Sequence, residues 1–326
     1  PPGAPDVEAA AARTAPYVRV TPTLPVELDG RVVELKLECL QVSGTFKARG
    51  AFARLLAARE AASREGKPLP VRVVAASGGN HGIAVAHAAR ALGMRANVFV
   101  PRTSPRAKLD RLRALGATVH AEGDEYAQAY SASRAFAIDH GALESHAYDQ
   151  FDTLAGQGTL AREWLEQSPR LDVLLVAVGG GGLIGGIAAW LDAQARHGTR
   201  VPRLVAVESE GCPTLHAALA AGRIAEIAPR GLAADSLGAR RVGELMFPLA
   251  QRRVAEAVLV PDEAIAAAQA ALWRVARVAA EPGGAAALAA LASGAWRPAP
   301  DERVGVLVCG ANVDLRALAD AVDGAA

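Results

Sequence analysis

One stretch of this chain decides the fold: Ser43-Gly44-Thr45-Phe46-Lys47-Ala48-Arg49-Gly50-Ala51. It lies between an apolar, strand-like run at residues 32–37 and a helical pattern that begins just after the lysine. A lysine at such a junction is held by two elements and is still open to a ligand, which suits an amine that forms a Schiff base. The two flanking glycines leave room for an aromatic ring to approach the backbone. The stretch therefore predicts a reactive amine at Lys47, with the flat face of Phe46 beside it.

Length and composition restrict the class of protein. The chain has 326 residues, enough for two domains or for one large α/β domain with an insertion. Lys and Arg number 35 against 34 Asp and Glu, a net charge of +1, so no overall field favours nucleic acid or a membrane. We expect a small-molecule partner. The cysteines Cys39, Cys212 and Cys309 are far apart and form no CxxC pair, which argues against a zinc site or disulfides and predicts a cytoplasmic setting.

Strand and helix patterns alternate along most of the chain. Residues 173–191 carry no charge, but their glycines break the run, so we interpret it as strand, loop and helix rather than a membrane span. We expect strands at residues 71–75, 96–100, 118–121, 142–146, 173–178, 204–207, 257–260 and 304–309. We expect helices at residues 81–92, 105–115, 124–140, 153–166, 183–195, 214–220 and 244–251, a long helical zone at 262–293, and a closing helix. Such alternation predicts βαβ units and a parallel sheet.

Two glycine-containing stretches follow predicted strands. Ser77-Gly78-Gly79-Asn80-His81-Gly82 opens a helix, where free backbone N–H groups make an anion site. The same pattern is typical of an ordinary turn capped by Asn80, and the residues alone leave both interpretations open. Gly179-Gly180-Gly181-Gly182-Leu183 joins an apolar strand to an apolar helix and predicts a phosphate cradle. It lacks the GxGxxG spacing of a dinucleotide fold, so a single phosphate fits better.

With Lys47 and these two loops, the chain resembles the serine/threonine dehydratase family, the β-eliminating branch of the fold type II pyridoxal phosphate enzymes. The resemblance covers nearly the whole chain and implies an α/β fold like that of the tryptophan synthase β subunit, with two three-layer αβα domains and mostly parallel sheets. It implies a large domain of residues 1–70 and 150–326 and a small domain of residues 71–149. Pyridoxal 5'-phosphate is the implied cofactor, in a cleft at the carboxyl ends of the strands.

The resemblance also implies roles for the motif residues. Lys47 would carry the cofactor and take the Cα proton of the substrate, and Ser77 would line the site as a second catalytic residue. Asn80 would bind the phenolic oxygen of the cofactor. The cofactor would also contact Phe46, Gly179, Gly180, Gly181, Gly182, Leu183 and Cys309. The substrate would be bound by Ser77, Gly78, Gly79, Asn80, His81 and Gln157, the last from a stretch that by its pattern alone is a helix start.

Three positions bear on the chemistry. Thr45 stands where the family usually has serine or alanine and keeps a hydroxyl. Gly78 replaces the serine that serves racemising members as acid/base on the opposite face, so elimination is favoured over racemisation. Cys309 would face the pyridine nitrogen, where a neutral thiol makes the ring a weaker electron sink and favours prompt loss of a β-leaving group. A small cysteine that fills a core is the alternative interpretation of Cys309.

Two acidic positions have weaker support. Glu208 matches the first carboxylate of a divalent-cation site in some relatives, but Thr214 stands where a second carboxylate is expected, and Glu210 is only a possible substitute. We therefore predict no metal. Glu281 lies in a stretch that resembles an acidic motif of the family near the active site, although a Pro-Gly turn explains the glycines equally well.

We expect a lyase that converts a β-hydroxy amino acid such as L-threonine or L-serine to a 2-oxo acid and ammonia. The alternatives are a dehydratase for 3-hydroxyaspartate or phenylserine, a β-replacing or racemising member of the same fold, such as a cysteine synthase, and a silent relative that senses amino acids. A homodimer is expected. The chain ends soon after its last motif, so we expect no regulatory domain of the kind that amino-acid-inhibited threonine deaminases carry.

Overall fold

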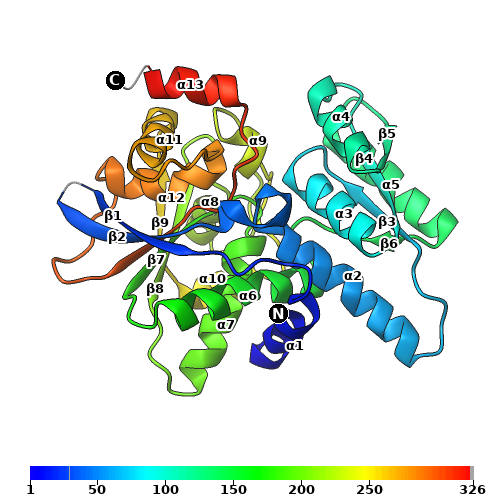
Figure 1. Cartoon of the computed structure of the whole chain (residues 1–326), viewed down its shortest axis with the longest axis horizontal. Coiled ribbons are helices and arrows are strands. Elements are labelled where there is room, and N and C mark those ends of the chain that lie inside the picture. The colour runs from blue at the N-terminus through cyan, green and yellow to red at the C-terminus, as the bar shows by residue number, and fades with distance from the viewer. Residues whose placement is uncertain (29, 324–326) are drawn as a thin grey trace.

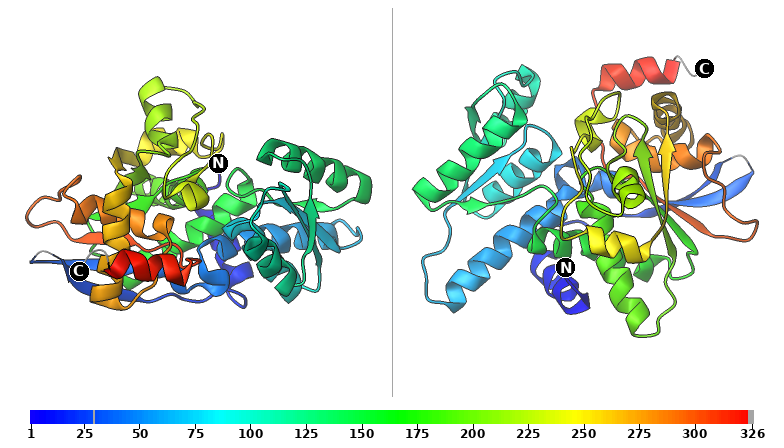
Figure 2. Two further views of the ribbon diagram at one scale, coloured as in Figure 1. Left: turned by 90° about the horizontal axis from the view of Figure 1, so that it is seen from above. Right: turned by 180° about the vertical axis from the view of Figure 1, so that it is seen from behind.

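The computed structural model describes residues 1–28 and 30–323. Its ten strands in this part of the chain form two separate sheets. Figure 1 shows the six-stranded sheet with its helices on the left and the four-stranded sheet with its helices on the right. The long helix α2 (Lys47–Arg64) runs from the junction of the two parts along the smaller one (Figures 1 and 2).

The larger sheet has the order β1-β2-β10-β7-β8-β9. Only the edge pair β1–β2 is antiparallel, and the other neighbours are parallel. Its strands are β1 (Thr23–Leu28), β2 (Arg31–Lys36), β7 (Val173–Ala177), β8 (Arg203–Ser209), β9 (Val254–Val260) and β10 (Val304–Leu307). β7 is buried along its whole length, as expected for a parallel strand covered on both faces.

The smaller sheet is parallel throughout, with the order β5-β4-β3-β6. Its strands are β3 (Arg72–Ala76), β4 (Arg95–Val100), β5 (Thr118–Ala121) and β6 (Leu143–Glu144). All of them come from the predicted small domain. The domain bounds at residues 71 and 149 stay a prediction. Helix α2 contributes Phe52 and Leu55 to the core of the smaller sheet and also packs on α6 (Phe151–Gln167) of the larger one.

Helices cover both faces of the larger sheet. α12 contacts β7, β8, β9 and β10 on one face, while α6 and α7 lie on the other (Figure 1). The remaining helices are α1 (Ala4–Thr14), α3 (Asn80–Ala91), α4 (Arg106–Ala114), α5 (Tyr126–His140), α6 (Phe151–Gln167), α7 (Gly182–Arg196), α8 (Thr214–Ala221), α9 (Ala234–Leu237), α10 (Phe247–Arg253), α11 (Asp262–Ala276), α12 (Pro282–Ala292) and α13 (Leu315–Asp323). Two short 3-10 turns, η1 (Glu38–Leu40) and η2 (Val42–Gly44), precede α2.

The expected alternation of strands and helices is present, and the uncharged run 173–191 is β7 followed by a loop and α7. Two differences are informative. The leader forms α1, because prolines are tolerated in the first turn and Val7 and Ala10 become buried. The alanine-rich zone is two helices, α11 and α12, since Arg277 adopts a left-handed conformation with φ 54° and Pro282 starts the second helix.

In the described part of the chain, no helix has both the length and the apolar character that crossing a bilayer requires.

Candidate active site

Lys47 begins α2 beside the end of β10. Thr45 pairs with Gly310 in an isolated β-bridge, and the N–H of Phe46 donates to the carbonyl of Cys309 at 3.2 Å. These contacts fix the start of α2 at the carboxyl end of the larger sheet. Nζ of Lys47 lies 3.4 Å from the carbonyl oxygen of Ala147 and 4.8 Å from the centre of the Phe46 ring.

Burial makes the Lys47 amine easier to deprotonate. Loss of hydration lowers its pKa to about 8, against the opposing effects of the neighbouring Cys309 and Glu281. An amine with this pKa has a substantial neutral fraction near neutral pH, and the neutral form is the nucleophile and the base. The predicted reactive lysine therefore has suitable electrostatics.

Four strand ends bring the predicted motifs together around this amine. The segment before α2 follows β2, the Asn80 loop follows β3, the glycine loop follows β7 and Cys309 follows β10. We call the pocket that they share the inner pocket. It is lined by Phe46, Lys47, Asn80, Tyr148, Ala177, Gly179, Gly180, Gly181, Gly182, Leu183, Ser236, Leu237, Glu281, Gly283 and Cys309. All the cofactor contacts expected from the sequence are in this set.

The glycine loop has the geometry of an anion cradle. A Cβ on Gly180 would lie 2.3 Å from the Tyr148 ring, and one on Gly182 would lie 2.8 Å from Cα of Tyr148. Gly181 has φ 84°, which disfavours other residues. Among the described residues, the amides from Gly180 to Leu183 meet no hydrogen-bond acceptor. Four unpaired amides at the start of α7 fit a phosphate, and together with Lys47 and Cys309 the pocket fits pyridoxal phosphate.

The Asn80 loop is tied to two distant segments. Nδ2 of Asn80 donates to Oε1 of Glu281 at 2.7 Å, and Oδ1 of Asn80 accepts from Nδ2 of Asn312 at 2.7 Å. The N–H of Gly79 donates to Oγ of Ser77 at 3.3 Å. The backbone N–H groups of Asn80 and His81 donate to no acceptor in the described part of the chain, so they remain available for a carboxylate.

Cys309 and Glu281 line the inner pocket from the segments that follow β10 and precede α12. The thiol donates to the carbonyl of Gly283 at 3.4 Å, and burial raises its pKa, so it is neutral. Burial also raises the pKa of Glu281, although the hydrogen bond from Asn80 opposes that shift. Near the pyridine nitrogen of the cofactor, this neutral thiol could not hold a positive charge as a carboxylate would.

A wider cavity of about 550 Å³ opens from the inner pocket, and we call it the outer cavity. Ser77, Gly78, Gly79, Asn80 and His81 all line it, as expected for substrate contacts. No motif in the sequence pointed to its other walls. One is aromatic, with Tyr126, Tyr130, His146 and Tyr148, and the other is the segment 234–241.

Two of the predicted residues, His81 and Glu208, have local hydrogen-bond partners. His81 hydrogen-bonds the Ser145 carbonyl at 2.9 Å, and burial lowers its pKa to about 3, so its ring stays neutral. Gln157 lies on α6, is buried against α2 and lines neither the inner pocket nor the outer cavity, so geometry adds no support for a substrate contact. Glu208 accepts from the amides of Leu215 and His216 and from Thr214, and thus caps α8. In the described part of the chain, His, Cys, Asp and Glu form no cluster of three that could hold a metal.

A buried cluster of charged side chains anchors the start of α2. Arg49 binds both carboxylate oxygens of Glu38, at 2.6 and 3.0 Å, and Oε2 of Glu163 at 2.8 Å. Lys36 donates to Oε1 of Glu163 at 2.5 Å and to the Thr21 carbonyl at 2.6 Å. The two cations are thus neutralised by two carboxylates, and β2, α2 and α6 are joined two residues beyond Lys47.

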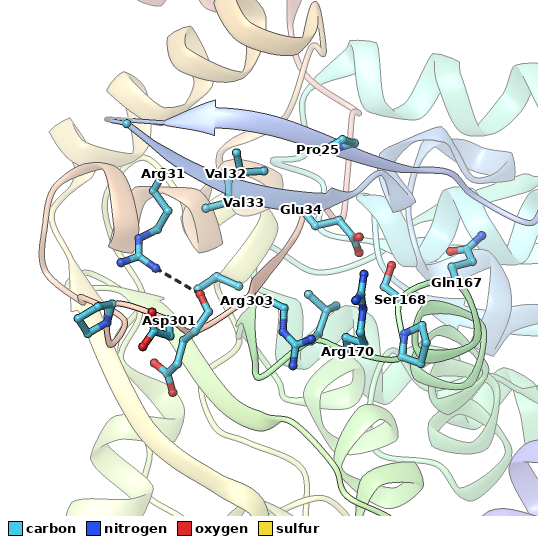
Figure 3. A pocket seen from close by; sticks show the side chains of 16 residues that line it. Pro25, Arg31, Val32, Val33, Glu34, Gln167, Ser168, Arg170, Asp301 and Arg303 are labelled. Atoms are coloured by element: carbon cyan, nitrogen blue, oxygen red, sulfur yellow. Dashed lines mark hydrogen bonds between the residues drawn. The ribbon is translucent and has the colours of Figure 1, made fainter.

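A further cavity lies elsewhere. It measures about 610 Å³ and lies near the amino-terminal ends of β2 and β10, with Arg31, Arg170 and Arg303 among its side chains (Figure 3). Nη1 of Arg31 donates to the carbonyl of Glu302 at 3.2 Å. Parallel α/β sheets bind ligands at the carboxyl ends of their strands, and none of the predicted site residues lines this cavity. We therefore assign the site to the inner pocket and outer cavity.

Comparison with known proteins identifies the family of this chain. A family model described as "Pyridoxal-phosphate dependent enzyme" matches residues 14–310. The chain is 35% identical over 318 residues to a phenylserine dehydratase of Ralstonia pickettii, covering 95% of this chain and 94% of the relative. It is 34% identical to an L-threonine ammonia-lyase of Thermotoga maritima, covering 89% and 69%, and 34% identical to a serine racemase of Oryza sativa subsp. indica, covering 96% and 91%.

Solved structures of related proteins have the same fold. The structure of maize serine racemase matches with a TM-score of 0.88 and 32% identity, covering 99% of this chain and 97% of that one. A threonine deaminase from T.th. matches with a TM-score of 0.85 and 34% identity, covering 96% and 99%. The cofactor expected from Lys47, the glycine loop and Cys309 is thus confirmed as pyridoxal phosphate, and the chain belongs to the serine/threonine dehydratase family of the fold type II pyridoxal-phosphate-dependent enzymes.

Proposed function

We propose that this protein removes water from a β-hydroxy amino acid such as L-threonine or L-serine and releases a 2-oxo acid and ammonia. The observation that carries the proposal is the convergence of a partly deprotonated Lys47, a phosphate-sized glycine cradle and the neutral thiol of Cys309 in one pocket. Two of the relatives named above, a phenylserine dehydratase and an L-threonine ammonia-lyase, are consistent with it.

The bound cofactor supplies an electron-withdrawing ring that acidifies the Cα–H of an attached amino acid. The chain supplies the rest of the chemistry. The free backbone N–H groups of Asn80 and His81 bind and orient the substrate carboxylate. The neutral Lys47 amine takes the Cα proton, and one proton leaves with the β-hydroxyl as water, so no net proton is released. A second water molecule is consumed when the C–N bond is hydrolysed, so a β-hydroxy amino acid is converted overall to a 2-oxo acid and ammonia.

Racemisation is the competing reaction, because serine racemases are among the relatives. A racemase needs a second acid/base on the face opposite the lysine. Gly78 offers no side chain there. This favours elimination.

The direct test is product analysis. The purified protein, loaded with pyridoxal phosphate, is incubated with L-serine and with L-threonine, and 2-oxo acid, ammonia and the D-enantiomer are measured. We expect equal amounts of oxo acid and ammonia. A D-amino acid without oxo acid would assign the protein as a racemase, and no product from any β-hydroxy amino acid despite bound cofactor would favour a ligand-binding role.

A second candidate is a dehydratase for a substrate with a bulky aromatic group on Cβ. The aromatic wall of the outer cavity favours it: Tyr126 and Tyr130 stack with ring centres 6.1 Å apart, and His146 and Tyr148 meet edge to face at 4.7 Å. The Ralstonia relative is named as a phenylserine dehydratase. A kcat/KM for 3-phenylserine above that for L-threonine would select this candidate, and the reverse order would reject it.

The predicted homodimer and cytoplasmic location stay proposals. Sedimentation analysis of the purified protein would test the dimer, and fractionation of cells would test the location.

A further inference from the structure

The amide of Asn80 can face the cofactor in two ways, and only one presents hydrogen-bond donors. Side-chain amides carry NH₂ on one side and oxygen on the other, so a half-turn exchanges two donors for an acceptor. A phenolate oxygen on a bound ring needs donors. Since no backbone bond of the loop selects between the two orientations, the choice must come from the groups that touch the amide.

Two side chains touch this amide, Glu281 and Asn312, and the orientation of Asn312 is itself fixed by groups of unambiguous polarity. Its Oδ1 accepts from Nη2 of Arg111, and a guanidinium can only donate. Its Nδ2 donates to the carbonyl of Ser43 at 3.1 Å, and a carbonyl can only accept. The amide of Asn312 therefore cannot turn over without losing both bonds.

The orientation of the Asn312 amide favours one orientation of the Asn80 amide. Nδ2 of Asn312 donates its second hydrogen to Oδ1 of Asn80 at 2.7 Å. This leaves Nδ2 of Asn80 on the other side, where one of its hydrogens bonds Glu281 at 2.7 Å and the second is available to the inner pocket. A turned Asn80 would set its NH₂ against the NH₂ of Asn312.

Two neighbouring residues that touch Asn312, Ser43 and Gly44, have unusual backbone geometry. Ser43, whose carbonyl binds Asn312, has φ 67°, which is strained for a residue with a side chain. A Cβ on Gly44 would lie 2.5 Å from Oδ1 of Asn312, so this position accepts only glycine while Asn312 is in place. Asn312 thus joins the lysine segment, the Asn80 loop and α4, which lies on the smaller part of the molecule.

We propose that Asn312, anchored by Arg111 and by the Ser43 carbonyl, is a positioning residue that holds the Asn80 amide with its NH₂ toward the cofactor. The inference rests on the predicted contact between Asn80 and the cofactor. It is independent of which substrate is used, because its test reads cofactor binding and not turnover.

The test compares three variants of the full chain loaded with pyridoxal phosphate: Asn312→Asp, Arg111→Met and Asn97→Asp. Asn312→Asp keeps the size and the contact with Arg111 but removes both donors, so the contact that favours the present orientation of Asn80 is replaced by one that favours the turned orientation. Asn97→Asp is the matched control, because Asn97 is a buried asparagine on β4 bonded to His120 and remote from both pockets. The readouts are the visible absorption band of the bound cofactor and its dissociation constant.

We expect Asn312→Asp to shift the absorption band and to raise the dissociation constant at least about tenfold, the effect of losing one hydrogen bond to a charged group. Arg111→Met should shift the band less, since the Ser43 carbonyl still orients Asn312. Asn97→Asp should keep the wild-type band. A wild-type band in Asn312→Asp, or an equal shift in Asn97→Asp, overturns the proposal.

If Asn312→Asp does not yield folded protein, Asn312→Ala decides, because it removes the same two donors from the half-buried Asn312 without adding a charge. A shifted band then supports the proposal and a wild-type band overturns it. If the variant keeps the wild-type band while the wild-type protein releases oxo acid normally, the inference is wrong and the proposed function still holds. If the wild-type protein binds the cofactor but releases no oxo acid, the proposed function is wrong and the inference can still be tested.

Discussion

The ring of Tyr148 lies where a side chain on Gly180 would be, with ring carbons 2.3–2.5 Å from the position of the added Cβ. Tyr148 follows β6, and Gly180 follows β7 of the other sheet. The contact therefore joins the two parts of the molecule directly at the glycine loop. It requires glycine at this position, and it holds the loop whose free amides form the cradle.

We expect Gly180→Ala to weaken binding of pyridoxal phosphate by about tenfold or more, because a contact of 2.3 Å forces the loop or the ring to move. The double variant Gly180→Ala with Tyr148→Ala removes the clash and should recover affinity relative to Gly180→Ala alone. Titration of the cofactor into the cofactor-free protein, followed by absorbance, measures both. Equal affinity of Gly180→Ala and wild type would contradict the steric argument.

Replacing Lys47 by alanine should abolish the visible absorbance of the covalently linked cofactor and the release of ammonia. The matched control is Lys67→Ala, which removes an exposed lysine that pairs with the exposed Glu65. Absorbance spectra and an ammonia assay on the two variants check the expectation. Normal ammonia release from Lys47→Ala would remove the basis of the proposed function.

The rate at which the cofactor-free protein takes up pyridoxal phosphate should rise with pH, with a midpoint near 8. Burial lowers the pKa of Lys47 to about 8, so the neutral amine that attacks the cofactor is about a tenth of the total at pH 7 and about nine tenths at pH 9. Stopped-flow absorbance between pH 6 and pH 10, conditions chosen to bracket that value by roughly two units, measures the profile. A midpoint at the ordinary lysine pKa would show that the amine is solvated.

Arg49→Met should lower the free energy of unfolding by about 3–5 kcal/mol, because it leaves the buried Glu38 and part of Glu163 without a cation. Arg203→Met is the control: Arg203 is 46% exposed in its pair with Glu302, so its loss should cost about 0–1 kcal/mol. Urea unfolding of the cofactor-free proteins compares them. Similar losses in the two variants would mean that the cluster around Arg49 contributes no more than a surface pair.

Gly78→Ser should introduce a measurable rate of serine racemisation where the wild type has none. The new hydroxyl would provide an acid/base on the face that we propose lies opposite Lys47, and among the described residues its Cβ comes within 4 Å of Val100 Cγ1, at 3.3 Å, and Ser104 Oγ, at 3.9 Å, so a small shift accommodates it. Chiral chromatography of the products from L-serine detects the D-enantiomer. Its formation by the wild type would instead show that another group serves the opposite face.

The sequence was sufficient to predict those features that depend on consecutive residues. The Lys47 segment, the Asn80 loop, the glycine loop and Cys309 are short motifs whose backbone chemistry is written in consecutive residues, and the regular alternation of strands and helices places them at the same edge of parallel sheets. The helix α1 was missed because its apolar residues are few, and their burial depends on α6.

Only the tertiary structure decided which side chains act together. Asn80 meets Glu281 and Asn312, which are 201 and 232 residues away in the chain, and Tyr148 reaches the glycine loop from the other sheet. No local pattern encodes such contacts, because hydrogen-bond polarity and steric fit depend on where two separately formed loops meet. The same holds for the depressed pKa of Lys47, which arises from burial by several segments and not from its neighbours in sequence.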